Sequence, residues 1–378
     1  MPVTAAGADP QAGTGLSTEK RKRLVLGISR LWAWVFLFSL IAFFSVSIWF
    51  REEINFLNLR NTQLILSTIV SVLLMGLGQT FVIISGGIDL SVGWVMGFAS
   101  VISAKVTVIM VGEGFGEFPA MIAGFAAALL GAAVVGLTSG IIIAKLRVPS
   151  FIVTLGMAFV VRGLALVVSG GQTVGGMPTG MRSFGNESLL YWTHGEGGGL
   201  AFLFKPEVTG EALRSMDRVL TWPVLVTAIT VGLAVFLLHK TQFGRHTYAI
   251  GGNQEASVRA GVPADRMTIM IFTLSACTAG LAGILHTARF SGGSAIAGDP
   301  LLLNSIAAVI IGGVSMYGGR GNVMGTVIGA LIIAILVTGL IMLRVEPFWQ
   351  WVIVGIVVIM AVLIDQARDL VVGRAESQ

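Results

Sequence analysis

The sequence predicts an all-α polytopic membrane protein with about ten transmembrane helices. Of its 378 residues, 55% are hydrophobic and only 11% are charged, whereas soluble domains carry about a quarter charged residues. Apolar runs long enough to cross a bilayer recur along almost the whole chain. The 50 glycines fit helices that pack closely through small residues, as membrane bundles do.

The chain begins with a polar segment, residues 1–23, that ends in the basic run KRKR. Its richness in small and polar residues predicts a disordered N-terminus. The apolar stretch that follows, up to Phe50, is too long for a signal peptide and shows no small-residue cleavage site. We therefore interpret it as a retained first helix.

The length that a crossing requires divides the remaining apolar sequence into spans. The ten expected spans are 27–49, 64–84, 91–111, 120–144, 151–168, 221–238, 267–286, 303–316, 325–343 and 349–366. Five spans belong to a first half, residues 24–220, and five to a second half, residues 221–366. A tail over 367–378 follows. The first half ends in a long polar segment, 169–220, and the second contains another, 239–266.

The distribution of charge predicts how the chain is oriented. If the first span begins in the cytoplasm, more of the lysines and arginines fall on cytoplasmic segments than elsewhere. Most carboxylates then fall on segments at the outer face. Because basic loops stay inside, both termini are expected in the cytoplasm. The segment 169–220 then lies outside, either as a docking surface for an external partner or as an insertion without fixed structure.

The polar stretch FGRHTYAIGGNQEASVRAGV, residues 243–262, has the marks of a short cytoplasmic helix. Gly251 and Gly252 break what precedes, Asn253 can cap, and 254–260 contains good helix formers. Gly261 then suits a helix C-cap. A short capped helix of this kind, projecting between the two membrane halves, is suited to be bound by another protein. An ordinary loop with one helical turn is the alternative.

A second unusual stretch is GQTFVIISGGIDLSVG, residues 78–93. Gly86 and Gly87 break a helix, and Asp89 or Ser91 can cap the next one. Broken helices commonly line substrate paths in transporters, because irregular backbone survives only beside protein or water. Asp89 either belongs to such a path or only caps the third helix, and the two roles are compatible.

Arg162 is a basic residue deep inside the predicted span 151–168. Intramembrane charge usually faces the bundle interior or a water path, so Arg162 either lines or gates such a path or extends its charge to the outer surface. The triplet SGG occurs at 85–87 and again at 291–293, after corresponding spans of opposite orientation. Inverted-topology halves would place it in this way.

The chain carries no recognisable enzyme motif. It has no GxxxxGK[ST] phosphate loop and no HExxH, and its four histidines are scattered. We therefore expect a transporter subunit rather than an enzyme, with no metal site, no cofactor and no nucleic-acid partner. Any drive by ATP must come from another polypeptide.

Four stretches together identify a family. They are GQTFVIISGGIDLSVG (78–93), KLRVPSFIVTLGMAFVVRG (145–163), FGRHTYAIGGNQEASVRAGV (243–262) and LLLNSIAAVIIGGVSMYGGRGNVMGTVIGA (301–330). In this order they closely resemble the ribose/xylose-type sugar permeases, which are the membrane subunits of bacterial ABC importers. The resemblance runs from about residue 60 to residue 366.

The resemblance implies a type II ABC importer-like fold and a homodimer embedded in the lipid of the bacterial inner membrane. It implies a translocation path along the two-fold axis, cytoplasmic ATP-binding subunits (two chains or one fused chain) and a periplasmic sugar-binding protein. The substrate would be a monosaccharide or polyol. The Phe348-Trp349-Gln350 stretch is similar to xylose permeases, so a pentose is among the candidates.

The resemblance also implies roles for individual residues. Those expected to contact the ATPase are Gly252, Asn253, Glu255, Arg259 and Gly261. Those expected near the translocation path or its gates are Gln79, Asp89, Ser91, Phe151, Thr154, Arg162 and Asn304.

Two other functions compete with this interpretation. An ion-coupled secondary sugar carrier could use Asp89 and Arg162 as a proton or ion relay, without any ATPase. It would have no evident use for the cytoplasmic capped helix. A membrane scaffold or receptor subunit would have no use for costly helix breaks at 85–91 and 312–319.

Overall fold

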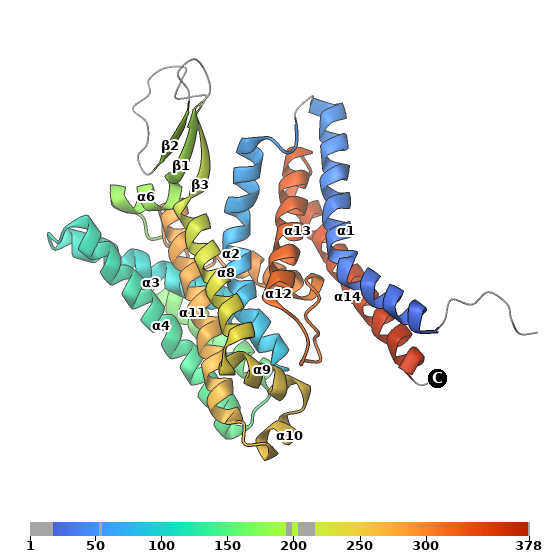
Figure 1. Cartoon of the computed structure of the whole chain (residues 1–378). Coiled ribbons are helices and arrows are strands. Elements are labelled where there is room, and N and C mark those ends of the chain that lie inside the picture. The colour runs from blue at the N-terminus through green and yellow to red at the C-terminus, as the bar shows by residue number, and fades with distance from the viewer. Residues whose placement is uncertain (1–17, 53–54, 194–198, 203–215, 377–378) are drawn as a thin grey trace, which may run out of the picture.

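The computed structural model describes residues 18–52, 55–193, 199–202 and 216–376. The fold is a helical membrane bundle with one small sheet, which confirms the predicted fold class (Figure 1). The long helices are α1 (Thr18–Glu52), α2 (Leu59–Ile84), α3 (Val92–Gly112), α4 (Glu117–Leu146), α5 (Ser150–Ser169), α8 (Trp222–Lys240), α11 (Ala264–Phe290), α13 (Val323–Met342) and α14 (Pro347–Glu376). The shorter helices are α6 (Thr179–Asn186), α9 (Gln242–Gly252), α10 (Gln254–Arg259) and α12 (Asp299–Ile311).

The bundle has two distinct ends (Figure 1). The strands and α6 lie at one, which we call the sheet end, and α9 and α10 lie at the other, which we call the α10 end. The beginning of α1 and the end of α14 both lie toward the α10 end (Figure 1), and these two helices pack against each other.

Within the described ranges, eight helices are long and apolar enough to cross a membrane, and two shorter apolar helices accompany them. One of the two is α12, which ends at Ile311, whereas the sequence predicted a span over 303–316. The helix ends there because Gly312 and Gly313 follow, and Gly313 has a φ of +82°.

The helices at the two chain ends extend beyond the predicted spans. Residues 18–23 belong to α1 and residues 367–376 to α14, while residues 1–17 lie outside the described part. Each segment continues an adjacent apolar helix and contains no proline, and Gly27 and Gly373 lie within these helices without ending them.

The segment 169–220 is partly folded rather than a structureless insertion. After α6 come β1 (Ser188–Thr193), β2 (Leu200–Phe202) and β3 (Met216–Thr221), in an antiparallel sheet of order β2-β1-β3. Tyr191 is buried, and its hydroxyl accepts a 3.0 Å hydrogen bond from the Ser188 backbone N–H. The sheet is absent from the sequence prediction. Residues 194–198 and 203–215 lie outside the described part.

Two helices form the centre of the bundle. α2 packs against α8, α11, α12 and α13, and α11 packs against α2, α3, α4 and α6. They approach closely where Gly78 faces Ser275, since a Cβ at Gly78 would lie 2.6 Å from the Ser275 Cα. Small residues allow such contacts in membrane bundles.

Helix contacts repeat between the two halves of the chain. α2 packs against α12 and α13 as α11 packs against α3 and α4. α3 packs against α4 and α5 as α12 packs against α13 and α14. α2 runs from the sheet end to the α10 end, and α11 runs back (Figure 1). This exchange of partners agrees with the predicted inverted-topology halves.

Candidate functional site

The chain between α2 and α3, residues 85–91, is not helical, and side chains of α5 satisfy its backbone. The Ile88 N–H donates to Ser150 Oγ at 3.1 Å, and the Leu90 N–H donates to Thr154 Oγ1 at 3.1 Å. Thr154 Oγ1 in turn donates to the Ser150 carbonyl at 2.9 Å. Irregular backbone at membrane depth needs such partners, so this break is built into the bundle.

Asp89 lies at the centre of the break and is 1% exposed. Its Oδ1 accepts hydrogen bonds from the Ser91 N–H at 2.9 Å and the Ser91 hydroxyl at 2.6 Å. Its Oδ2 accepts from the Ser275 hydroxyl of α11 at 2.8 Å. Gln79 Nε2 of α2 donates to the Asp89 carbonyl at 2.5 Å. We call Gln79, Asp89, Ser91 and Ser275 the Asp89 cluster; it ties the break to a helix of the other half.

The structure therefore brings four of the predicted path residues together: Gln79, Asp89, Ser91 and Thr154. Ser91 is the N-cap residue of α3 by position, but its hydroxyl serves Asp89 and makes no cap hydrogen bond. Sequence reasoning missed Ser150 and Ser275. Nothing local marks either serine, because small residues on membrane helices are common in packing roles.

The other three predicted path residues lie apart from the cluster. Phe151 is 51% exposed at the start of α5. The Arg162 guanidinium lies over the Trp94 ring, 4.5 Å from its centroid. Asn304 is half-buried on α12. In the part of the chain that the structure describes, Asp89 has no ion-pair partner, so it is not paired with Arg162.

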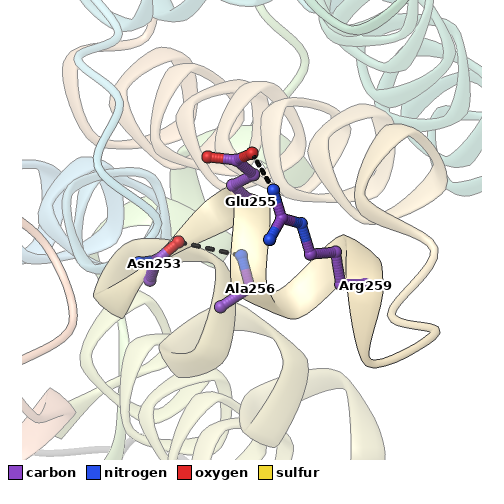
Figure 2. A network of polar contacts seen from close by, with 4 residues as sticks. All are labelled: Asn253, Glu255, Ala256 and Arg259. Carbon is purple, nitrogen blue, oxygen red and sulfur yellow. Dashed lines mark hydrogen bonds and ion pairs between the residues drawn. The ribbon is translucent and has the colours of Figure 1, made fainter.

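The predicted cytoplasmic helix is present as α10 (Figure 2). Asn253 Oδ1 accepts a 2.9 Å hydrogen bond from the Ala256 N–H, and Gly261 follows the helix with a φ of +86°. Glu255 and Arg259 form a 2.6 Å ion pair one turn apart, and each side chain is 78% exposed. The helix is thus fixed at both ends and presents its charged face to the surroundings.

The helix α9, which precedes α10, was not predicted. Its last residues are the Gly251-Gly252 pair that we expected to break structure. Tyr248 anchors it, because its hydroxyl donates to the Gly321 carbonyl at 2.6 Å. Burial raises the pKa of the Tyr248 hydroxyl, which keeps this donor protonated.

α9 ends in a backbone contact with α2. Gly319 N–H donates to the Ile84 carbonyl, the last residue of α2, at 2.8 Å. A Cβ at Gly251 would overlap both the Ile84 carbonyl oxygen and the Gly319 nitrogen. Gly318 and Gly319 have φ values of +84° and +70°, which only glycine adopts readily. We call Ile84, Gly251, Gly318 and Gly319 the glycine junction; it joins α9 to the beginning of the break at 85–91.

No group of three or more His, Cys, Asp or Glu side chains within the described ranges is placed to hold a metal ion. The contacts described at the break, α10 and the glycine junction are hydrogen bonds, close backbone approaches and one exposed ion pair. A break in the membrane region, an exposed capped helix and a glycine junction between them suit the transmission of movement.

Comparisons with known proteins give these features a context. A family model described as "Branched-chain amino acid transport system / permease component" matches residues 61–362. The Ribose import permease protein RbsC of Escherichia coli (strain K12) is 35% identical over 315 residues, which cover 83% of this chain and 88% of that protein. The Xylose transport system permease protein XylH of Haemophilus influenzae is 34% identical over 362 residues, covering 87% and 94%. No solved structure matches.

Proposed function

This chain belongs to the transport-permease family that includes the ribose and xylose import permeases, and from this we propose that it is the membrane subunit of an ATP-driven sugar importer. The cargo is a monosaccharide or polyol, a pentose among the candidates. The observation that carries the proposal is α10, an exposed helix fixed at both ends and joined to a break in the membrane bundle.

We propose that α10 is the coupling helix that a separate ATPase chain grips. Glu255 and Arg259 offer that partner one charge of each sign, while Gly252, Asn253 and Gly261 set the shape of the surface. Because the Glu255–Arg259 pair is exposed, it contributes little to stability on its own and is free to exchange partners on docking.

Movement of α10 would reach the membrane through the glycine junction. α9 lies against the Ile84 carbonyl at Gly251 and packs Phe243 on Phe81 of α2, so a shift of α9 would displace the end of α2 and the break that holds Asp89. ATP binding that favours one conformation of the ATPase would then favour one conformation of the break at 85–91. In this proposal Gln79, Asp89, Ser91 and Thr154 form the hinge.

We propose that a second copy of the chain completes the path. α5 carries an exposed face that includes Phe151, Leu155 and Phe159 and also the exposed Arg162. Lipid covers apolar side chains well, but a charge facing lipid is costly. A neighbouring copy with a water-filled path between the two would accommodate the apolar residues and Arg162. Asn304 is assigned to the same path.

The α10 end is assigned to the cytoplasm, together with both termini, and the sheet end to the side of a periplasmic sugar-binding protein. Residues 24–220 and 221–366 would be the two halves that rock against each other, with 239–266 as the coupling segment. The contact exchange between α2 and α11 supports this division.

The test is to tag the C-terminus, extract the chain from its own host in mild detergent and identify what accompanies it. We expect an ATPase chain that is lost when residues 253–261 are scrambled. Lys145→Gln is the control, since it removes the exposed 2.8 Å Lys145–Asp265 ion pair at the same end from the α4 side, outside the coupling segment.

Two outcomes would contradict the proposal. If the scrambled variant still co-purifies with the ATPase, α10 is not the site that the ATPase binds. A chain that purifies alone, with sugar uptake that survives ATP depletion, would favour the ion-coupled carrier.

A further inference from the structure

A cavity of about 420 Å³ lies at the sheet end, away from the Asp89 cluster and from α10. Its walls come from the beginnings of α2 and α8, the ends of α6, α11 and α13, and β3. No role assigned above uses it.

The cavity is strongly basic. Arg60 of α2, Arg218 of β3 and Arg289 of α11 line it together with His286, and no Asp or Glu is among its lining residues. Arg218 Nη1 donates to the Asn186 carbonyl at 2.6 Å, and Arg289 Nη1 donates to the Ser67 carbonyl. Among the described residues, no carboxylate pairs with any of the three arginines. Three like charges are thus gathered without a counter-charge from the described chain.

The ends of two helices add to the positive potential. α2 begins at Leu59 and α8 at Trp222, and both beginnings border the cavity through Asn61 and Pro223. A helix N-terminus carries about half a positive charge and favours anions. The N-cap of α8, Thr221, makes no side-chain cap hydrogen bond.

His286 supplies a polar atom that lacks a partner. Its Nδ1 is buried and has no hydrogen-bond partner within the described residues, while its ring packs on Phe290 at 4.5 Å between centroids. An unsatisfied buried donor or acceptor costs about 1–3 kcal/mol. His286 therefore lines the cavity with its ring, while its Nδ1 is turned away from solvent.

The lining also indicates which ligand fits. A cation is disfavoured by the three guanidinium groups. The lining has no carboxylate to accept from sugar hydroxyls and no Trp, Tyr or Phe on which a sugar ring could stack. Arginine forks match phosphate oxygens in pairs. Leu64, Leu285 and Met342 add apolar surface beside the charged groups, as an amphiphile would need.

We propose that this cavity binds a phosphate group, held by Arg60, Arg218 and Arg289. The phosphate comes either from the headgroup of an anionic phospholipid or from free phosphate. Bound there, it joins α2, β3 and α11, and so stabilises the folded chain by mass action.

The test uses the full chain in a neutral detergent and follows its thermal unfolding with two additives, each beside its own control. Inorganic phosphate is compared with chloride at equal ionic strength, and micelles doped with phosphatidylglycerol are compared with micelles doped with phosphatidylcholine. We expect a rise in unfolding temperature of at least roughly 2 °C with the binding additive. A rise with phosphatidylglycerol alone identifies a lipid headgroup, a rise with inorganic phosphate alone identifies free phosphate, and a rise with both identifies a site that takes the phosphate group from either source.

Arg60→Gln with Arg218→Gln should abolish the rise, whereas Arg182→Gln, an exposed arginine of α6 outside the cavity, should leave it intact. If the double variant fails to fold, Arg60→Gln alone replaces it and should weaken the apparent affinity at least about tenfold. The proposal is overturned if no additive raises the unfolding temperature, if the cavity variants keep the full rise, or if Arg182→Gln loses it as well.

Discussion

At the scale of single residues, Asp89 separates the competing mechanisms. Both of its carboxylate oxygens accept hydrogen bonds from Ser91 and Ser275, so its side chain holds the break together. Asn can keep the Oδ1 bonds and, through its amide, donate to Ser275, whose hydroxyl can turn to a carbonyl of its own helix. An aliphatic side chain can do neither.

We therefore expect Asp89→Asn to reduce ATP-driven sugar uptake by no more than a few fold. Asp89→Leu should reduce it at least about tenfold and lower the free energy of unfolding by at least about 1 kcal/mol for each donor left unsatisfied. The measurement is uptake into proteoliposomes that contain the whole importer, with and without a proton gradient. Complete loss of uptake in Asp89→Asn, together with a requirement for the gradient, would instead support a proton relay.

The residue scale also shows what sequence can and cannot supply. Asp89 stood out because a carboxylate in apolar sequence is rare and costly. Ser275, its partner on α11, did not, since 186 positions separate the two and nothing near Ser275 signals the contact. Local chemistry therefore predicted one side of the cluster, and only the packed fold identifies the other.

At the scale of elements, the helix α10 was predictable from the sequence. The contacts that link it through α9 to the membrane helix α2 were not. Asn253 and Gly261 are local signals of where a helix begins and ends, and both act as expected. α9 and the glycine junction depend on contacts between three distant segments. A glycine in sequence does not state whether it supplies a turn, a break or a close approach.

The glycine junction leads to a prediction about coupling. Gly251→Ala places a Cβ where the Ile84 carbonyl lies, so α9 must separate from α2. We expect the assembled importer to keep hydrolysing ATP while sugar uptake falls at least about tenfold. Gly112→Ala is the control, because a Cβ there meets no atom within 4 Å. Equal losses of hydrolysis and uptake would show that the junction supports assembly rather than coupling.

A second prediction at this scale concerns the close approach of α2 and α11. Gly78→Ala puts a Cβ 2.6 Å from the Ser275 Cα, which forces the two central helices apart and disturbs the Asp89 cluster. Overpacking of this kind typically costs about 1–3 kcal/mol. Thermal unfolding in detergent should show a clear decrease in melting temperature. The same Gly112→Ala variant is the control, and an unchanged melting temperature in Gly78→Ala would contradict the predicted clash.

At the scale of the whole molecule, the proposed orientation can be tested with single cysteines. Cys277 is the only cysteine and is half-buried, so a Cys277→Ser background gives a clean starting point. Val258 at the α10 end is 52% exposed and Leu200 in β2 is 60% exposed. A membrane-impermeant thiol reagent on intact spheroplasts should label Leu200→Cys and not Val258→Cys. In inside-out vesicles the pattern should reverse, and the opposite result would invert the proposed topology.

The overall architecture was largely predictable because hydrophobic length is a strong constraint in membranes. The chain positions of all ten expected spans correspond to helices, although α12 is shorter than predicted. The sheet at 188–221 was missed, since short strands outside the bilayer have no comparable constraint. The exchange of contacts between α2 and α11 required the folded arrangement.

The glycine junction has an evolutionary consequence. Its contacts are made by backbone atoms, whereas the charged side chains of α10 lie one or two turns away and are exposed. If α10 is the coupling helix proposed above, substitutions on that face would alter which ATPase binds without altering the backbone contacts that transmit its movement. A permease of this design could be transferred between ATPases by grafting a handful of surface residues, and motor choice could drift independently of cargo choice.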